Sequence, residues 1–217
     1  MPPTYLIDLY DTLVHSDWDR WRDELSRGAG ISLETLDRAF HETRAPRNTG
    51  AYATLEESSR AIVLAAGLPD DPDIVRWWVD MDVRFMEDGV RLYEDSLPTV
   101  RALRARGYAT VLVSNCGPDT RLLVDRLELT AEFDALILSF EAGARKPDPA
   151  IYEAALSAVE GRRDDAVFVD DQAAYCDGAR ALGIDTRLIV RPDASPPEGF
   201  AAASNGHVVI RNLTELL

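Results

Sequence analysis

Short apolar runs, most of them rich in β-branched residues, recur along the chain and are separated by stretches with helical spacing. The runs cover residues 4–7, 108–114, 135–139, 165–170, 186–190 and 207–210. Their nearly continuous apolar character is typical of strands covered on both faces, as in a parallel sheet. Between them, patterns such as 97–107 place Leu97, Val100 and Leu103 on one helical face and end at Gly107. This alternation predicts an α/β fold with a doubly wound parallel sheet.

Residues 14–90 interrupt the alternation. We expect no strand there and four helices instead, at 17–28, 33–45, 54–67 and 73–89. A small helical bundle inserted after the first strand would lie over the carboxyl ends of the strands, where ligands bind in such sheets. The sequence therefore predicts an α/β core of residues 1–13 and 91–217 and an inserted helical unit of residues 14–90.

Composition narrows the classes of partner. The 217 residues carry a formal net charge of -15, from 38 acidic and 23 basic side chains. Such a surface repels phosphates and anionic membranes, so we expect neither nucleic acid nor a membrane as partner. No apolar run approaches the roughly 20 residues of a membrane span, and no export signal is visible. Two cysteines make neither a disulfide framework nor a metal cluster, which favours a soluble protein of the reducing cytoplasm.

Two adjacent tryptophans bear on self-association. Trp77 and Trp78 cannot both face one core, so we expect one of them to be exposed. An exposed large apolar side chain can mark a partner surface, and this leaves a homodimer open.

Polar side chains follow four of the predicted strands, or the loops after them, where they can meet at one sheet edge. They are Asp8, Tyr10 and Thr12, then Ser114 and Asn115, then Lys146, and finally Asp170 and Asp171. A carboxylate at this edge can attack an electrophile, and a second acidic group can hold Mg²⁺ through oxygen ligands. A lysine and a hydroxyl can offset charge on a phosphoryl group. The set predicts a catalytic centre for a small-molecule substrate.

Four motifs in this order resemble those of the haloacid dehalogenase (HAD) superfamily over nearly the whole chain. DLYDTL is similar to the first motif, VLVSN to the second, ARKPDPAIY to the third and FVDDQAAYCDGARALGI to the fourth. The helical segment after the first motif is similar to the family's C1-type cap. The resemblance implies a Rossmann-like core and a hydrolase.

The resemblance also implies a role for each motif residue. Asp8 would be the nucleophile and Ser114 would bind the transferring group. Lys146 would brace the transferring group and Asp8. Mg²⁺ would be held by Asp8, the backbone carbonyl of Tyr10 and Asp170, with Asp171 nearby or bound through water. Thr12 would order the turn around the nucleophile.

Tyr10 departs from the phosphatase form of the first motif, which has a second aspartate there to protonate the leaving alcohol. Tyrosine is a poor acid-base near neutrality because its ordinary pKa is about 10, and loss of such a group slows turnover roughly 10²- to 10⁴-fold. The D-L-Y opening occurs in metal-free 2-haloacid dehalogenases, which expel halide without a proton. Those carry small neutral residues where this chain has Asp170 and Asp171, a pair that repels Asp8 unless a cation lies between them.

We therefore expect a Mg²⁺-dependent phosphatase, with a 2-haloacid dehalogenase as the alternative enzyme. A binding or regulatory protein that has the fold without catalysis is the alternative from another class. Asp11, one place beyond Tyr10, is a further hypothesis for the missing acid if the chain turns there.

Substrate-binding residues are expected at the strand ends, namely Thr12 and Asn115, and in the inserted helices. TRAPRNTGAY, residues 43–52, contains breakers that predict a loop, and its Arg44 and Arg47 can bind an anionic group. Trp18 and Trp21 lie one helical turn apart, so we expect them to pack in a core, with pocket lining as the other reading.

Overall fold

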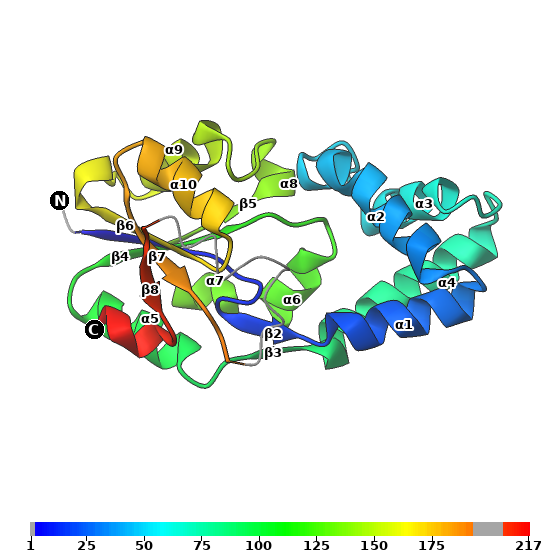
Figure 1. Ribbon diagram of the computed structural model, residues 1–217, viewed down its shortest axis with the longest axis horizontal. Coiled ribbons are helices and arrows are strands. Elements are labelled where there is room, and N and C mark those ends of the chain that lie inside the picture. Colours follow the sequence, from blue (N-terminus) through cyan, green and yellow to red (C-terminus); the bar gives the residue numbers. More distant parts are fainter. Residues whose placement is uncertain (1–2, 193–205) are drawn as a thin grey trace.

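The computed structural model describes residues 3–192 and 206–217. Its centre is a six-stranded parallel sheet in the order β5-β4-β1-β6-β7-β8, which confirms the doubly wound α/β prediction (Figure 1). The strands are β1 Thr4–Ile7, β4 Ala109–Ser114, β5 Ala135–Leu138, β6 Ala166–Asp170, β7 Asp185–Ile189 and β8 Val208–Ile210. β1 lies between β4 and β6, so the first, second and fourth motifs follow three neighbouring strands.

Successive side chains of each central strand bury against opposite layers of helices. Leu6 and Phe168 belong to the core on one face of the sheet, and Ile7 and Val169 belong to the core on the other. Helices α9 and α10 cover the first face and α5 the second (Figure 1). They span Pro149–Ala158, Ala173–Ala181 and Ser96–Ala105. Since both faces are covered, both phases of each strand are apolar, which is why the sequence runs are nearly continuous.

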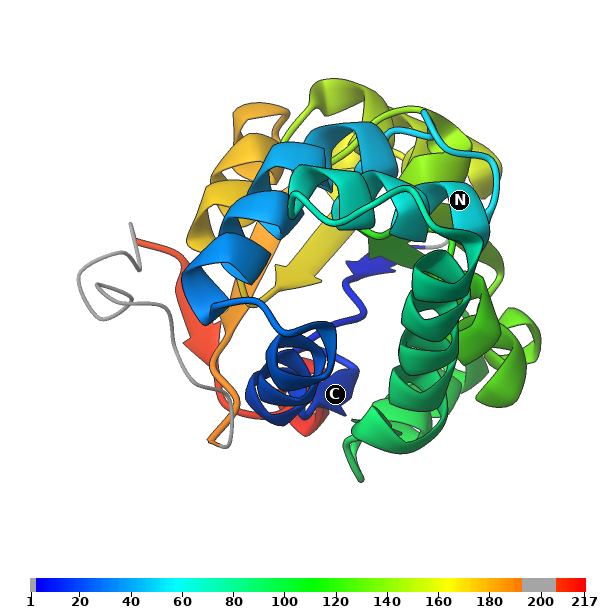
Figure 2. The same cartoon turned by 90° about the vertical axis from the view of Figure 1, so that its right-hand side faces the viewer.

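Four helices follow the first strand and form what we call the helical unit, α1 to α4. They are α1 Trp18–Ala29, α2 Leu33–Asn48, α3 Leu55–Ala65 and α4 Pro72–Arg84, followed by the π-helical turn Phe85–Gly89. Side-chain caps begin α2, α3 and α4: Ser32, Thr54 and Asp71 each accept a hydrogen bond from a backbone N–H of the first turn. The unit stands beyond the carboxyl ends of the strands (Figures 1 and 2). Among the described residues, no helix has both the length and the apolarity that a membrane crossing needs.

The expectation of no strand between residues 14 and 90 was wrong at its first residues. β2, Val14–Ser16, pairs antiparallel with β3, Val90–Leu92. Three residues are too few for a visible alternation, and the partner lies at the far end of the helical unit, so no local pattern could show the pair. The two chain crossings between core and helical unit are held side by side by this ribbon. The predicted boundaries at residues 14 and 90 fall on it.

The expected loop over residues 43–52 was also wrong in its first half, because α2 continues to Asn48 through Pro46. The missing N–H of Pro46 costs one hydrogen bond in the last turn, where the helix is ending. The Pro46 carbonyl still accepts from the N–H groups of Thr49 and Ala51, which closes the helix. Arg44 and Arg47 therefore project from a helix rather than from a loop.

The prediction that Trp77 or Trp78 is exposed was wrong. Trp78 is fully buried, and Trp77 is half-buried with its ring against the backbone at Gly28. A Cβ added at Gly28 would lie 2.4 Å from the Trp77 ring, so glycine is what permits this approach. The homodimer stays a prediction without support from this pair.

Candidate functional site

Lys146 joins two of the predicted motif residues at the sheet edge. Its Nζ lies 2.5 Å from Asp8 Oδ1, 2.6 Å from Asp170 Oδ2 and 3.0 Å from the Val113 carbonyl oxygen. All three donors of the ammonium are thereby used. The Asp8 N–H donates to the Val169 carbonyl, which continues the pairing of β1 with β6 and aims the side chain over the strand ends. Lys146, Asp8 and Asp170 are almost completely buried.

This arrangement changes one step of the sequence argument. The acidic fourth motif was expected to need a cation beside Asp8, and Lys146 supplies one between Asp8 and Asp170. Burial disfavours the ammonium, but the charges of Asp170 and Asp8 outweigh it and raise the pKa of Lys146 above its ordinary value. The lysine therefore stays charged in this position at neutral pH.

Asp8, Asp170 and Asp171 form a carboxylate cluster that could hold a metal ion. One oxygen from each lies within 4.8 Å of the others. Burial raises the pKa of Asp170, and Lys146 offsets part of this increase. Burial, and then the neighbouring carboxylates of Asp170 and Asp8, raise the pKa of Asp171. Carboxylate oxygens are ligands that Mg²⁺ prefers, and a divalent ion would offset the negative charge that Lys146 leaves uncompensated. The donor set fits Mg²⁺, and the Tyr10 carbonyl stays a predicted ligand.

Two hydroxyls of the motifs are buried and lack a hydrogen-bond partner among the described residues. They are Ser114 Oγ, at the end of β4, and Thr12 Oγ1, in the turn after Asp8. A buried hydroxyl without a partner costs about 1–3 kcal/mol, and such groups concentrate where a ligand completes them. The role of Ser114 in binding the transferring group stays a prediction, and its hydroxyl is free to accept or donate such a hydrogen bond among the described residues.

Asn115 is committed to the protein itself. Its Nδ2 donates to the Lys146 carbonyl oxygen at 2.9 Å, and the Lys146 N–H donates to its Oδ1 at 2.7 Å. This pair of hydrogen bonds ties the loop of the third motif to the end of β4. Asn115 also lines the cavity described below, so direct substrate contact stays a prediction.

The Tyr10 side chain is poorly suited to acid-base catalysis. Its hydroxyl shares a hydrogen bond with Thr120 Oγ1 at 3.0 Å. Burial, followed by the nearby charge of Asp119, raises the pKa of Tyr10 well above its ordinary value. The phenol therefore keeps its proton at neutral pH and is a poor base and a poor acid. Asp11 lies in the left-handed region at φ 55° and lines the cavity, and its role as a replacement acid stays a hypothesis.

A cavity of about 930 Å³ lies between the helical unit and the loops at the strand ends. Arg47 lines it, with Nε donating to Thr43 Oγ1 and an Nη donating to the Phe40 carbonyl oxygen. Among the described residues, no carboxylate lies within ion-pair distance of its guanidinium. Burial lowers the pKa of Arg47. Arg44 is exposed, lines the same cavity and donates to the Tyr175 hydroxyl of α10 at 3.4 Å.

The cavity also contains residues that the sequence argument missed. Asp82 of α4 is 8% exposed, accepts a hydrogen bond from Ser59 Oγ at 3.0 Å, and has its pKa raised to about 8 by burial. Helical spacing from the buried Val75 and Trp78 places Asp82 on the inner face of α4, and this signal was available. Asp119, just past the second motif, also lines the cavity.

The chain belongs to the haloacid dehalogenase-like hydrolases. Residues 2–183 match the family model of the haloacid dehalogenase-like hydrolases. The class is thus a hydrolase with a parallel α/β core, which the resemblance of the four motifs predicted.

Its relatives include both phosphatases and haloacid dehalogenases. The chain is 28% identical over 203 residues to phosphatase MT3486 of Mycobacterium tuberculosis, covering 86% of each chain. It is 31% identical over 125 residues to (S)-2-haloacid dehalogenase 1 of Pseudomonas sp. (strain CBS-3), covering 57% of this chain and 54% of that protein.

One solved structure is of a HAD family enzyme from Bacteroides thetaiotaomicron in complex with magnesium and inorganic phosphate. It has a TM-score of 0.70 and 22% identity, covering 88% of this chain and 95% of that one.

Proposed function

We propose that this chain is a Mg²⁺-dependent phosphatase of a small phosphorylated compound, with Asp8 as the nucleophile. The observation that carries the proposal is the carboxylate cluster of Asp8, Asp170 and Asp171, whose oxygens lie within 4.8 Å of one another. The unpartnered hydroxyl of Ser114 adds a hydrogen-bonding group for a phosphoryl oxygen. The match to phosphatase MT3486 over 86% of both chains supports the same reading.

In the proposed reaction a carboxylate oxygen of Asp8 attacks phosphorus, and the bond from phosphorus to the leaving oxygen breaks with its electron pair. An aspartyl-phosphate and an oxyanion result. Water then attacks the phosphorus, phosphate leaves, and the Asp8 carboxylate is restored. Ser114 would donate to a phosphoryl oxygen, and Lys146 would hold Asp8 in position and contribute positive charge beside the phosphoryl group. Mg²⁺, held by Asp8, Asp170 and Asp171, would supply further positive charge there.

Residues 14–90 are proposed as a C1-type cap over this centre. The cavity between the helical unit and the strand-end loops supports that role, as does the β2–β3 ribbon at both crossings. Arg44 and Arg47 are proposed to bind substrate from the cap side. A location in the cytoplasm and a homodimer remain parts of the proposal that rest on the sequence.

The test is phosphate release from a panel of phosphorylated metabolites and acetyl phosphate, with Mg²⁺ and with chelator. We expect Mg²⁺-dependent release that falls to background in Asp8→Asn, because the nucleophile is gone. Asp164→Asn, an exposed change in the turn before β6 and so at the opposite end of that strand from Asp170, is the control and should retain activity. Release that survives Asp8→Asn would refute the nucleophile assignment.

A metal-free 2-haloacid dehalogenase is the second candidate, and two observations favour it. Tyr10 supplies no proton to a leaving group, and Lys146 already lies between Asp8 and Asp170. Halide release from 2-chloropropionate, unaffected by chelator, would replace the phosphatase proposal. If neither phosphate nor halide is released, the binding or regulatory alternative is favoured.

A further inference from the structure

The cavity beside the proposed centre is much larger than a phosphoryl group. Its volume of about 930 Å³ is at the upper end of the range, roughly 300–1,000 Å³, in which proteins hold drug-sized ligands. The lining runs from Tyr10, Asn115 and Thr120 on the core side to α1, α2 and α4 on the other. A substrate that fills it has a bulky leaving group that reaches from the strand ends to the helical unit.

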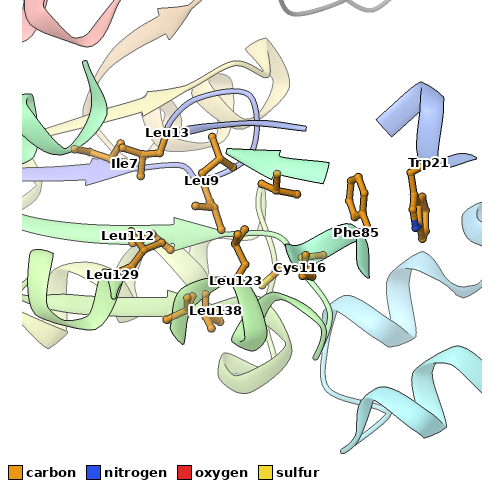
Figure 3. Packing of buried hydrophobic residues seen from close by; sticks show 14 of the residues in the cluster. Ile7, Leu9, Leu13, Trp21, Phe85, Leu112, Cys116, Leu123, Leu129 and Leu138 are labelled. Carbon is orange, nitrogen blue, oxygen red and sulfur yellow. The ribbon is translucent and has the colours of Figure 1, made fainter. Parts of the chain in front are cut away.

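The helical unit presents aromatic rings to this cavity. We call Trp18, Trp21, Phe40 and Phe85 the aromatic wall, and all four line the cavity. The Trp18 ring centroid lies 5.0 Å from that of Trp21, 5.4 Å from that of Phe40 and 6.3 Å from that of Phe85. Figure 3 shows the Trp21 and Phe85 side chains next to each other, apart from the sheet core.

Trp18 is the member of the wall that is open to a ligand. Its side chain is 38% exposed, whereas Trp21 and Phe85 are 7% and 6% exposed. Because the rings of Trp21, Phe40 and Phe85 pack against Trp18, they restrict its side chain before any ligand arrives. Planar rings gain from offset or edge-to-face contact with such a side chain.

The chemistry at the other end of the cavity selects for the same kind of group. Tyr10 stands where a proton donor would be needed, and its hydroxyl is bound to Thr120. Because Tyr10 gives the leaving oxygen no proton, a leaving group that is stable as an anion reacts more easily. An aryloxide delocalises that charge into its ring and departs more easily than an alkoxide.

We propose that the preferred substrates are aryl phosphate monoesters, with the ring of the leaving group resting on Trp18 of the aromatic wall. This inference rests on the proposed phosphatase function. Asp8 takes the phosphoryl group, the bond from phosphorus to the aryl oxygen breaks, and the aryloxide leaves with the electron pair and takes a proton from water. Water then attacks the phosphorus of the aspartyl-phosphate, and the bond from phosphorus to the Asp8 oxygen breaks. Phosphate leaves, and the proton that this water gives up balances the one that the aryloxide took.

The experiment compares phenyl phosphate with a fluoroalkyl phosphate of matched leaving-group acidity, so that only the ring differs. We expect wild-type kcat/KM to favour the phenyl ester about tenfold, in line with one aromatic contact. Trp18→Leu should lose this preference and keep the apolar cover over Phe85. Trp77→Leu, a half-buried tryptophan that does not line the cavity, is the matched control and should retain it.

Equal kcat/KM for the two esters in the wild-type enzyme, or a preference that persists in Trp18→Leu, would overturn the inference. Hydrolysis of acetyl phosphate in either case would leave the phosphatase proposal standing. If no phosphate is released from any compound, the phosphatase proposal fails. Calorimetric binding of phenylphosphonate and methylphosphonate then decides the aromatic site alone. Tighter binding of the phenyl compound that is lost in Trp18→Leu supports the site, and equal or absent binding refutes it.

Discussion

Several charged side chains in this protein are buried, and neighbouring groups of opposite charge offset the cost of burying them. Lys146 forms ion pairs with the carboxylates of Asp8 and Asp170. Among the described residues, Asp82 has no such ion-pair partner: its hydrogen bond comes from the neutral hydroxyl of Ser59. Burial therefore raises the pKa of Asp82 to about 8, and folding takes up a proton there at neutral pH.

The pH dependence of stability should reveal Asp82. Its folded pKa lies above its unfolded value, so its contribution to stability is complete below pH 4 and is lost as pH rises to about 8. Asp82→Asn keeps an acceptor for Ser59 and does not titrate. We expect the variant to gain up to about 3 kcal/mol in unfolding free energy relative to wild type between pH 5.5 and 8.5, since one pKa unit is about 1.4 kcal/mol.

Urea denaturation at several pH values measures this difference. Asp80→Asn, an exposed change on the same helix, should follow wild type across the range. A difference between Asp82→Asn and wild type that is constant with pH would contradict the assignment.

Among the elements, the end of β7 supports the turn after β1. Arg191 follows β7 and is 5% exposed. Its Nε and one Nη donate to the Thr12 carbonyl oxygen at 3.1 and 2.6 Å, and its other Nη lies 2.8 Å from Asp95 Oδ2. Its guanidinium also lies 4.1 Å from the centroid of the Tyr93 ring. A residue 179 positions away thus holds the backbone of the first motif in place.

Arg191→Met should reduce stability by about 3 kcal/mol, because it leaves the largely buried Asp95 carboxylate without a counter-charge, with only the Leu213 N–H, among the described residues, donating to its Oδ2. Arg191→Lys should recover part of the stability but little of the activity, since a lysine keeps the charge without the two-pronged hydrogen bonding to Thr12. Thermal melting and kcat are the measurements. Arg187→Met on β7, whose partner Asp185 is largely exposed, should cost about 0.5 kcal/mol or less. Equal losses in the two methionine variants would argue against this role of Arg191.

The whole molecule carries a formal net charge of -15, and its self-repulsion disfavours the compact state. Salt should therefore raise the melting temperature by screening, and MgCl₂ should raise it further than NaCl at equal ionic strength if the carboxylate cluster binds the ion. At ten times its dissociation constant, Mg²⁺ adds about 1.4 kcal/mol, or about 3 °C for a chain of this size.

Scanning calorimetry of wild type and Asp170→Asn separates these effects. The variant should retain the response to NaCl and lose the additional response to MgCl₂. Asp164→Asn should retain both responses. Identical melting curves of the wild-type protein in the two salts would refute the metal site without reference to any activity.

The sequence by itself determined the sheet, the helices and which residues stand at the strand ends. Strands covered on both faces must be apolar in both phases, so six short runs identified β1, β4, β5, β6, β7 and β8 within a residue or two. Since parallel strands present their carboxyl ends at one edge, the sequence alone predicts that Asp8, Ser114 and Asp170 converge. The sequence did not predict the short β2–β3 ribbon, because three residues are too few to show a period. It did not predict the last turn of α2 either, because Pro46 makes that stretch resemble a loop.

Only the tertiary structure decided what surrounds these residues. Lys146 lies 138 residues from Asp8 in the chain, and its position between two carboxylates depends on how the third loop packs against β4. The Asp82 side chain and the aromatic wall meet the strand ends across a cavity that exists only when the helical unit stands over the sheet. Local patterns specify secondary structure and the ends of strands, whereas the charge balance of the site and the shape of its cavity arise from contacts between segments far apart in sequence.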